Sequence, residues 1–405
     1  MPGGQGYRQL LGMPMPRRLA LAALPADFAD WLDYAAVVAL LVFAWGEGPL
    51  TLALFAVALS SPYVIIGPAL AVLVDRLPLG RVMLWSNLGR AAATFLLIIA
   101  PNSAVVLALV FVRAAIDSAF GPARQSAIKA TTPVELLGVA NGMHQAINQI
   151  SKIVGPALGG ALLAFMPAQS VFAVNGGLSI VAAALVIGIR LPRAEREVED
   201  RKGGFLGEAM AGFAEFGRSR LLLVALVFSS VAYFSMFLYD ALIALLMTEL
   251  GLDATAFGLS ISASGLGGLI GALLAGRVAG WNPLLWMGAA ALFGGLVTIA
   301  VAVAALAGLS IDIALFCAAM LLMGGSSAFM LVPYRTAIQS QTHPDRLARV
   351  VAAGEAVTTV VMLTAPFIGS VVATRWGTPT AFIVGGIGLA VLGLVTVVVR
   401  LIRRN

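Results

Sequence analysis

Residues 122–139 read PARQSAIKATTPVELLGV, and residues 333–350 read PYRTAIQSQTHPDRLARV. The second segment follows the first at an offset of 211 residues (122 to 333) without a gap. The aligned identical pairs are Pro122/Pro333, Arg124/Arg335, Thr131/Thr342, Pro133/Pro344, Leu136/Leu347 and Val139/Val350. Each segment joins one long apolar stretch to the next, so this parallel repeat predicts two similar halves in tandem.

Composition places the chain in a membrane. Of its 405 residues, 60% are hydrophobic and only 11% are charged. A soluble domain carries about 25% charged residues, so a water-soluble protein of this size would lack the polar residues to cover its surface. We therefore predict an all-α membrane protein.

Apolar runs of about 20 residues, long enough to cross the bilayer as helices, occur twelve times. The predicted spans are 19–45, 51–74, 82–101, 104–126, 139–165, 168–190, 221–250, 254–276, 284–307, 312–334, 349–374 and 378–400. Together with the repeat, they predict two parallel six-helix bundles, residues 1–190 and 221–405. The charged segment 191–220 would be the linker, with an amphipathic helix at 204–217 on the membrane surface.

The basic residues predict the orientation, because they are retained on the cytoplasmic side. With a cytoplasmic N-terminus, 21 of the 25 Lys and Arg residues fall in cytoplasmic segments, and only Arg375 lies on the opposite side. An even number of spans then puts both termini in the cytoplasm, and we predict a bacterial inner-membrane location. Spread over all the loops in this way, the positive charge does not indicate nucleic-acid binding.

The loop between the second and third predicted spans reads GPALAVLVDRLPLGRV at residues 67–82. It resembles the cytoplasmic signature loop of the major facilitator superfamily, although two extra residues separate Asp-Arg from Gly-Arg. That spacing, with FGPARQ at 120–125, ANG at 140–142 and GPALGG at 155–160, is similar to the branch containing the enterobactin exporter and macrolide efflux pumps. The resemblance covers nearly the whole chain.

Two groups of conformational residues follow from the resemblance. It implies that Asp75, Arg76, Gly80 and Arg81 latch the two halves in the outward-open state; anchoring of the topology is the alternative. The second group, Gly155, Pro156, Gly159 and Gly160, resembles the fifth-helix motif of antiporters in this superfamily. Proline frees a carbonyl and glycine permits close contact, which suits a moving helix interface; a static kink is the alternative.

Ionisable residues inside predicted spans are functional candidates, because burying a charge in the bilayer costs several kcal/mol. Asp30 and Asp33 in the first span are the leading proton-coupling candidates, whereas Asp27 in that span is as well explained as a cap or a snorkelling residue. Asp240 in the seventh span is the counterpart of Asp30 or of Asp33. Arg113 and Asp117, four residues apart, would share a helix face and neutralise each other, as a structural pair or a coupling pair.

Other polar residues indicate a wet substrate cavity. Lys152 in the fifth span would bind an anionic substrate group or pair with a first-span aspartate. The remaining substrate-cavity candidates are His144, Gln145, Asn148, Gln149, Arg90 and Glu355. In the eighth predicted span, Gly267 and Gly271 have the spacing of close helix packing rather than of a nucleotide loop. Cys317 is interpreted as a packing residue.

These observations predict a monomeric secondary transporter working by alternating access. The resemblance implies a proton-coupled antiporter for efflux of a small amphipathic molecule such as a siderophore, macrolide or drug. The alternatives are a lysophospholipid flippase of the same fold and a siderophore or metabolite importer. The sequence lacks a nucleotide loop, a metal-spaced cluster and a nucleophile motif, so we predict no enzyme activity, cofactor or metal.

Overall fold

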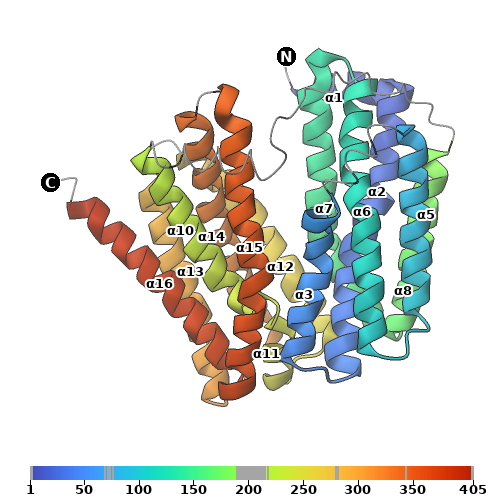
Figure 1. Cartoon of the computed structure of the whole chain (residues 1–405). Coiled ribbons are helices and arrows are strands. Elements are labelled where there is room, and N and C mark those ends of the chain that lie inside the picture. Colours follow the sequence, from blue (N-terminus) through green and yellow to red (C-terminus); the bar gives the residue numbers. More distant parts are fainter. Residues whose placement is uncertain are drawn as a thin grey trace. The chain divides into compact units, whose positions relative to one another are not determined.

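A computed structural model describes residues 3–67, 70, 74, 77–187, 216, 219–278, 282–342 and 344–402. All regular elements in this part of the chain are helices (Figure 1). The α-helices are α1 (Gly3–Gly12), α2 (Pro14–Val38), α3 (Pro49–Ile65), α5 (Leu79–Leu97), α6 (Ser103–Thr131), α7 (Leu137–Leu163), α8 (Ala168–Val186), α10 (Arg220–Asp240), α11 (Ile243–Glu249), α12 (Ala254–Val278), α13 (Pro283–Leu306), α14 (Ile313–Gln341), α15 (Pro344–Trp376) and α16 (Thr378–Ile402). A π-helix, η1 (Ala39–Ala44), continues α2, and a 3-10 turn, η2 (Val134–Leu136), precedes α7.

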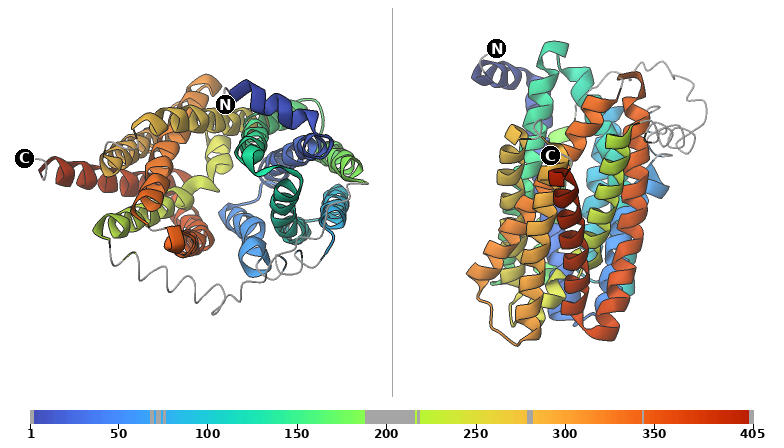
Figure 2. Two further views of the ribbon diagram at one scale, coloured as in Figure 1. Left: turned by 90° about the horizontal axis from the view of Figure 1, so that it is seen from above. Right: turned by 90° about the vertical axis from the view of Figure 1, so that its left-hand side faces the viewer.

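The chain divides into two compact units. Unit 1 comprises Met1–Trp45 and Ala58–Glu199, and unit 2 comprises Gly46–Val57 and Asp200–Asn405. Within unit 1, α2 packs against α7 and α8, and α5 packs against α6 and α8. The helices of this unit run side by side, nearly end-on in the view from above (Figure 2).

Unit 2 repeats this pattern of helix pairs. Its helix α10 packs against α15 and α16, and α13 packs against α14 and α16. The caps of two equivalent helices also match: the Asn102 side chain accepts a hydrogen bond from the Val105 amide at 3.0 Å, and Asp312 accepts one from Leu315 at 2.8 Å. The internal repeat of the sequence therefore extends to the pairing and capping of the helices.

The predicted spans agree with the helices over most of their length, with one correction. Residues 221–250 do not form one helix, because α10 ends at Asp240 and α11 begins at Ile243. The first predicted span is the continuous run of α2 and η1, and α1 is an additional helix that the sequence did not predict. Leu10 of α1 is fully buried in a small core cluster with Ile128, Leu136 and Ala140.

By length and composition, eight of the described helices are apolar enough to cross a membrane, and α3 is a shorter apolar helix. The eight are α6, α8, α10, α12, α13, α14, α15 and α16. All six long helices of unit 2 are among them. The long helices that fall outside this group, α2, α5 and α7, belong to unit 1 and carry most of the ionisable residues that the sequence placed inside spans. Unit 1 is therefore the more polar bundle.

Close backbone contact at glycine holds unit 2 together. A Cβ added at Gly267 of α12 would overlap the carbonyl of Leu321 of α14, and one at Gly324 would overlap the carbonyl of Ser264. The same holds for Gly369 of α15 against the carbonyl of Leu238 in α10. The packing prediction for the eighth span is thereby confirmed, since small residues let membrane helices approach closely.

We expect Gly369→Ala to destabilise the protein by about 1–3 kcal/mol or more, because the new methyl group collides with backbone rather than with a mobile side chain. Thermal unfolding in detergent measures this effect. Gly177→Ala in α8 is the matched control, because a Cβ there meets no atom within 4 Å. Equal unfolding temperatures for the two variants would contradict the account of helix packing.

Candidate functional site

Helix α2 carries three aspartates that differ in exposure. The Asp27 and Asp33 side chains are each 3% exposed, whereas that of Asp30 is 33% exposed. At about 100° and 1.5 Å per residue, positions three apart step up the helix and partly around it. The three carboxylates therefore meet different neighbouring helices.

Asp30 is shared between two arginines. The Arg113 guanidinium of α6 donates to Asp30 Oδ1 at 2.8 Å, and that of Arg90 of α5 donates to the same oxygen. The Arg90 side chain is fully buried and also donates to the carbonyl of Ala26 at 3.1 Å. One carboxylate oxygen thus joins α2, α5 and α6.

Each arginine also contacts a second carboxylate. Arg113 Nη1 lies 3.1 Å from Asp33 Oδ2, and Arg90 Nη1 lies 3.1 Å from Asp117 Oδ1. The two outermost groups of this series of ion pairs are uncharged. Asn175 of α8 donates to Asp33 at 2.8 Å, and Tyr63 of α3 donates to Asp117 at 2.5 Å.

We call this series the charge chain. Its members, in order, are Tyr63, Asp117, Arg90, Asp30, Arg113, Asp33 and Asn175. It joins α2, α3, α5, α6 and α8 within unit 1. A charge buried in the bilayer is tolerated when it is paired, and this alternation of acid and base pairs every charged member of the series.

Asp27 belongs to a separate ion pair. Arg124 of α6 donates to Asp27 Oδ1 at 2.6 Å. The Phe120 ring lies between the two sets, with the Arg90 and Arg124 guanidinium carbons each 5.5 Å from its centroid. Asp27 is therefore a buried, paired carboxylate, and its interpretation as a snorkelling residue is wrong.

The structure corrects two further predictions about charged partners. The spacing of Arg113 and Asp117 predicted that they pair with each other, but both form their ion pairs with residues on other helices. Arg90, predicted to line a substrate cavity, is buried completely among carboxylates. Both arginines therefore belong to the charge chain.

Helix α7 packs on α2 next to Asp30. A Cβ at Gly155 would lie 2.8 Å from the Trp31 Cβ, and one at Gly159 would lie 3.2 Å from the Ala35 Cβ. The Lys152 ammonium sits over the Trp31 ring, 5.3 Å from its centroid. Lys152 thus contacts the first-span tryptophan rather than a first-span aspartate. Pro156 and Gly160 are buried in the same helix.

The other polar candidates of α7 differ in exposure. His144 is buried, Asn148 and Gln149 are half-buried, and Gln145 is exposed. In unit 2, Asp240 is the half-buried last residue of α10, and Glu355 is exposed on α15. None of these residues belongs to the charge chain.

The loop candidates are only partly described. Gly80 and Arg81 lie in the first turn of α5, with Arg81 exposed, whereas Asp75, Arg76 and nearly all of segment 204–217 lie outside the described residues. The described part of the chain holds no group of three or more His, Cys, Asp or Glu residues suited to a metal ion.

Sequence reasoning missed Tyr63 and Asn175 as members of the site. Both are uncharged, so the search for ionisable residues inside spans passed over them. Asn175 does carry a signal in the sequence, because an amide inside a predicted span needs a hydrogen-bond partner, although the sequence does not show which one.

Comparison with known proteins settles the family. The model of the Major Facilitator Superfamily matches residues 19–311 and 230–405, which together cover most of the chain. The chain belongs to the major facilitator superfamily. It is therefore a multi-pass membrane transporter, and the prediction that it is not an enzyme is confirmed.

Two relatives within the superfamily are informative. The MFS-type transporter YfiS of Bacillus subtilis (strain 168) is 29% identical over 386 residues, covering 94% of this chain and 92% of the relative. Macrolide efflux protein A of Streptococcus pyogenes is 24% identical over 352 residues, covering 85% of each chain. The resemblance to macrolide efflux pumps seen in the sequence motifs is thereby confirmed.

Solved structures support the fold. The nucleoside transporter NupG matches with a TM-score of 0.71 at 13% identity, covering 95% of this chain and 98% of its own. A bacterial homologue of the human lysosomal transporter Spinster matches with a TM-score of 0.68 at 13% identity, covering 95% of each chain. At such identity the likeness concerns the fold alone.

We expect Arg90→Gln to lower the free energy of unfolding by about 3–5 kcal/mol, because it removes the ion-pair partner of Asp117 and leaves Asp30 with Arg113 alone. Thermal unfolding in detergent measures the loss, with the exposed Arg375→Gln as control. The double variant Arg90→Gln/Asp117→Asn should lose less than the sum of its single variants, since the two groups interact directly. Strict additivity would show that the ion pair does not contribute.

Proposed function

We propose that this protein is a proton-coupled antiporter that exports small amphipathic molecules, with macrolides as the first substrate class to test. The observation that supports proton coupling is the net formal charge of the charge chain. It holds the three carboxylates Asp30, Asp33 and Asp117 against the two guanidinium groups of Arg90 and Arg113, a formal charge of −1 (2 minus 3).

One proton on Asp30 would balance the chain completely. Arg113 would remain paired with Asp33, and Arg90 with Asp117, so that four charges form two neutral pairs. A proton on Asp33 or Asp117 would balance the count equally, because Asp30 would then pair with the arginine that the neutral acid released. Exposure is what favours Asp30: its carboxylate is 33% exposed, against 3% for Asp33 and 20% for Asp117, so protons reach it most easily.

Loss of the Asp30 charge changes how the helices are joined. Deprotonated Asp30 attracts Arg90 and Arg113 together, which ties α2 to both α5 and α6. The protonated form holds each guanidinium more weakly, because the attraction between opposite charges is lost and only a hydrogen bond to a neutral acceptor remains. Protonation of one side chain thus biases the packing of three helices, which is the kind of two-state element that coupled transport needs.

The direction of transport and the substrate class rest on the relatives. Proteins named macrolide efflux protein A match over 85% of this chain in Streptococcus pyogenes and over 57% in Enterococcus faecalis. A macrolide combines a large apolar ring with polar substituents, so it is an amphipathic molecule of the proposed kind.

The test for coupling is macrolide transport in reconstituted vesicles with an imposed pH gradient. We expect Asp30→Asn to lose gradient-driven transport at least tenfold while keeping macrolide exchange between the two sides, because exchange needs no change in protonation. Asp312→Asn is the matched control, since Asp312 is an exposed cap whose role asparagine can fill. Unchanged gradient-driven transport in Asp30→Asn would sink the coupling proposal.

We further propose a monomer with twelve spans in a bacterial inner membrane and both termini in the cytoplasm. Residues 1–190 and 221–405 would be the two bundles, and 191–220 their linker. The distribution of basic residues supports this orientation, and the recurrence of the same helix pairs in each unit supports the two similar bundles.

Cysteine labelling tests this topology, because Cys317 is the single native cysteine. In a Cys317→Ala background, we expect Asp312→Cys to react with a membrane-impermeant maleimide in spheroplasts. Lys129→Cys, exposed in the last turn of α6, should react only after permeabilisation. The reverse pattern would overturn the orientation, and labelling of both before permeabilisation would overturn the placement of these helix ends on opposite sides.

A further inference from the structure

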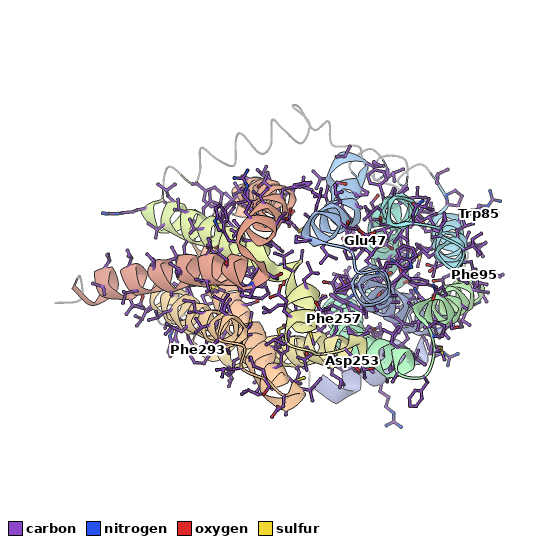
Figure 3. The ribbon with its side chains drawn as sticks, turned by 90° about the horizontal axis from the view of Figure 1, so that it is seen from below. Glu47, Trp85, Phe95, Asp253, Phe257 and Phe293 are labelled. Atoms are coloured by element: carbon purple, nitrogen blue, oxygen red, sulfur yellow. The ribbon has the colours of Figure 1, made fainter. Side chains whose placement is uncertain are left out.

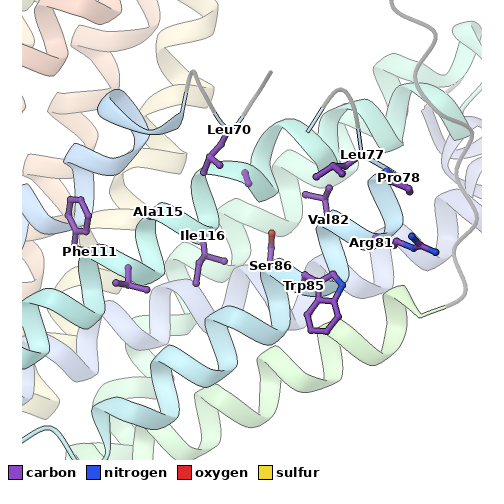
Figure 4. Close-up of a pocket in the computed structure, with 12 residues that line it drawn as sticks. Leu70, Leu77, Pro78, Arg81, Val82, Trp85, Ser86, Phe111, Ala115 and Ile116 are labelled. Atoms are coloured by element: carbon purple, nitrogen blue, oxygen red, sulfur yellow. The ribbon is translucent and has the colours of Figure 1, made fainter. Parts of the chain in front are cut away.

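A groove on unit 1 lies apart from the charge chain. It has a volume of about 610 Å³ and is formed mainly by α5 and α6 (Figure 4). Its apolar lining includes Val82 and Trp85 of α5 and Phe111, Val112 and Ile116 of α6. Arg81 is the one charged side chain among the described residues that line it.

The groove is open to the surroundings of the protein. Trp85 is 68% exposed and Val112 is 48% exposed, and the Trp85 side chain projects away from its helix at the periphery of the unit (Figure 3). In a membrane protein, exposed apolar surface of this kind faces lipid acyl chains, so the chemistry of the groove walls suits a hydrocarbon chain.

The dimensions of the groove also suit a chain. Along α6 its lining runs from Phe111 to Ala119, and eight residues at about 1.5 Å each give a length of about 12 Å. At the level of Gly89, α5 comes close to α6, because a Cβ there would lie 3.1 Å from Ile116 Cδ1. The groove is therefore elongated and backed by packed helices.

A positive charge marks one end of the groove. Arg81 lies in the first turn of α5, and Phe111 lies at the other end of the row of lining side chains (Figure 4). The Arg81 guanidinium is exposed and forms no ion pair with a carboxylate among the described residues. A guanidinium matches the geometry of a phosphate group, which it binds through two parallel hydrogen bonds.

We propose that this groove binds an anionic phospholipid of the bilayer, with one acyl chain between α5 and α6 and the phosphate at Arg81. Charge complementarity at Arg81 decides the occupant, because an acyl chain alone would not need a cation at one end. The proposal is independent of proton coupling. It does place the lipid against Val112 and Ile116, each one residue before a member of the charge chain on α6.

The test is native mass spectrometry of the full chain with phosphatidylglycerol and phosphatidylcholine of identical acyl chains. We expect the wild type to retain phosphatidylglycerol preferentially, and Arg81→Gln to lower this preference about fivefold, the effect of one basic side chain on an anionic lipid. Arg220→Gln, an exposed arginine in the first turn of α10, is the matched control. Equal retention of both lipids by the wild type would overturn the proposal.

A second variant tests the acyl-chain part. Ala115→Trp places an indole in the groove and should reduce retention of both lipids, whereas Leu296→Trp on the exposed face of α13 should leave it unchanged. If Ala115→Trp unfolds, quenching of wild-type fluorescence by acyl-brominated lipids replaces it. The component lost in Trp85→Phe should be quenched more by brominated phosphatidylglycerol than by brominated phosphatidylcholine at equal mole fraction, and equal quenching would contradict the site.

Discussion

Unit 1 depends on the sharing of one carboxylate, Asp30, between Arg90 and Arg113. An unpaired charge in a poorly solvated interior costs far more than one ion pair returns, so each guanidinium must find carboxylates on neighbouring helices. That requirement fixes how α2, α5 and α6 lie relative to one another. It also explains why α2 and α5, which carry Asp30, Asp33 and Arg90, are less apolar than the spans of unit 2.

The two units meet the same packing problem with different interactions. At the repeat offset of 211 residues, Arg113 corresponds to Gly324 and Asp117 to Ala328. Gly324 lies against the backbone of Ser264, and the Ala328 Cβ is 3.1 Å from a Cβ placed at Gly271. The helix position that holds α6 by charge in unit 1 holds α14 by close contact with α12 in unit 2. The two units thus share one arrangement of helices, and at these positions only unit 1 has charged side chains.

Much of this organisation could be predicted from the sequence, because it depends on local patterns. Apolar length predicts a span, and the repeat predicts the recurrence of helix pairs. The partners of the charged residues could not be predicted in this way. Periodicity shows which face of a helix a side chain occupies, and it put Arg113 beside Asp117, but the choice between a neighbour on the same helix and one on another helix depends on tertiary packing.

The partners of the uncharged members of the site could not be predicted for a related reason. Tyr63 and Asn175 have no formal charge, and their role follows only from the carboxylate oxygens that remain after the arginines are placed. The break between Asp240 and Ile243 was hidden as well, since the residues around it are as apolar as those of a continuous helix. The apolar composition of such a segment predicts that it is buried, but it does not show where the helix is interrupted.

Asp30 lies next to the glycine contacts between α2 and α7, so a change in its charge could affect how these two helices pack. Trp31, the next residue, contacts the backbone at Gly155 and lies under the Lys152 ammonium. Glycine has no side chain that could absorb a shift at this contact, so any rotation of α2 that the proposed protonation of Asp30 causes would have to move α7 or open the contact. The same rotation would carry Asp33 relative to Arg113, whose pairing limits how far α2 can turn. Under the proposed coupling, the charge chain would set both the trigger and the range of the motion, and the glycine contact would pass it to α7, the one long helix of unit 1 that holds no member of the charge chain.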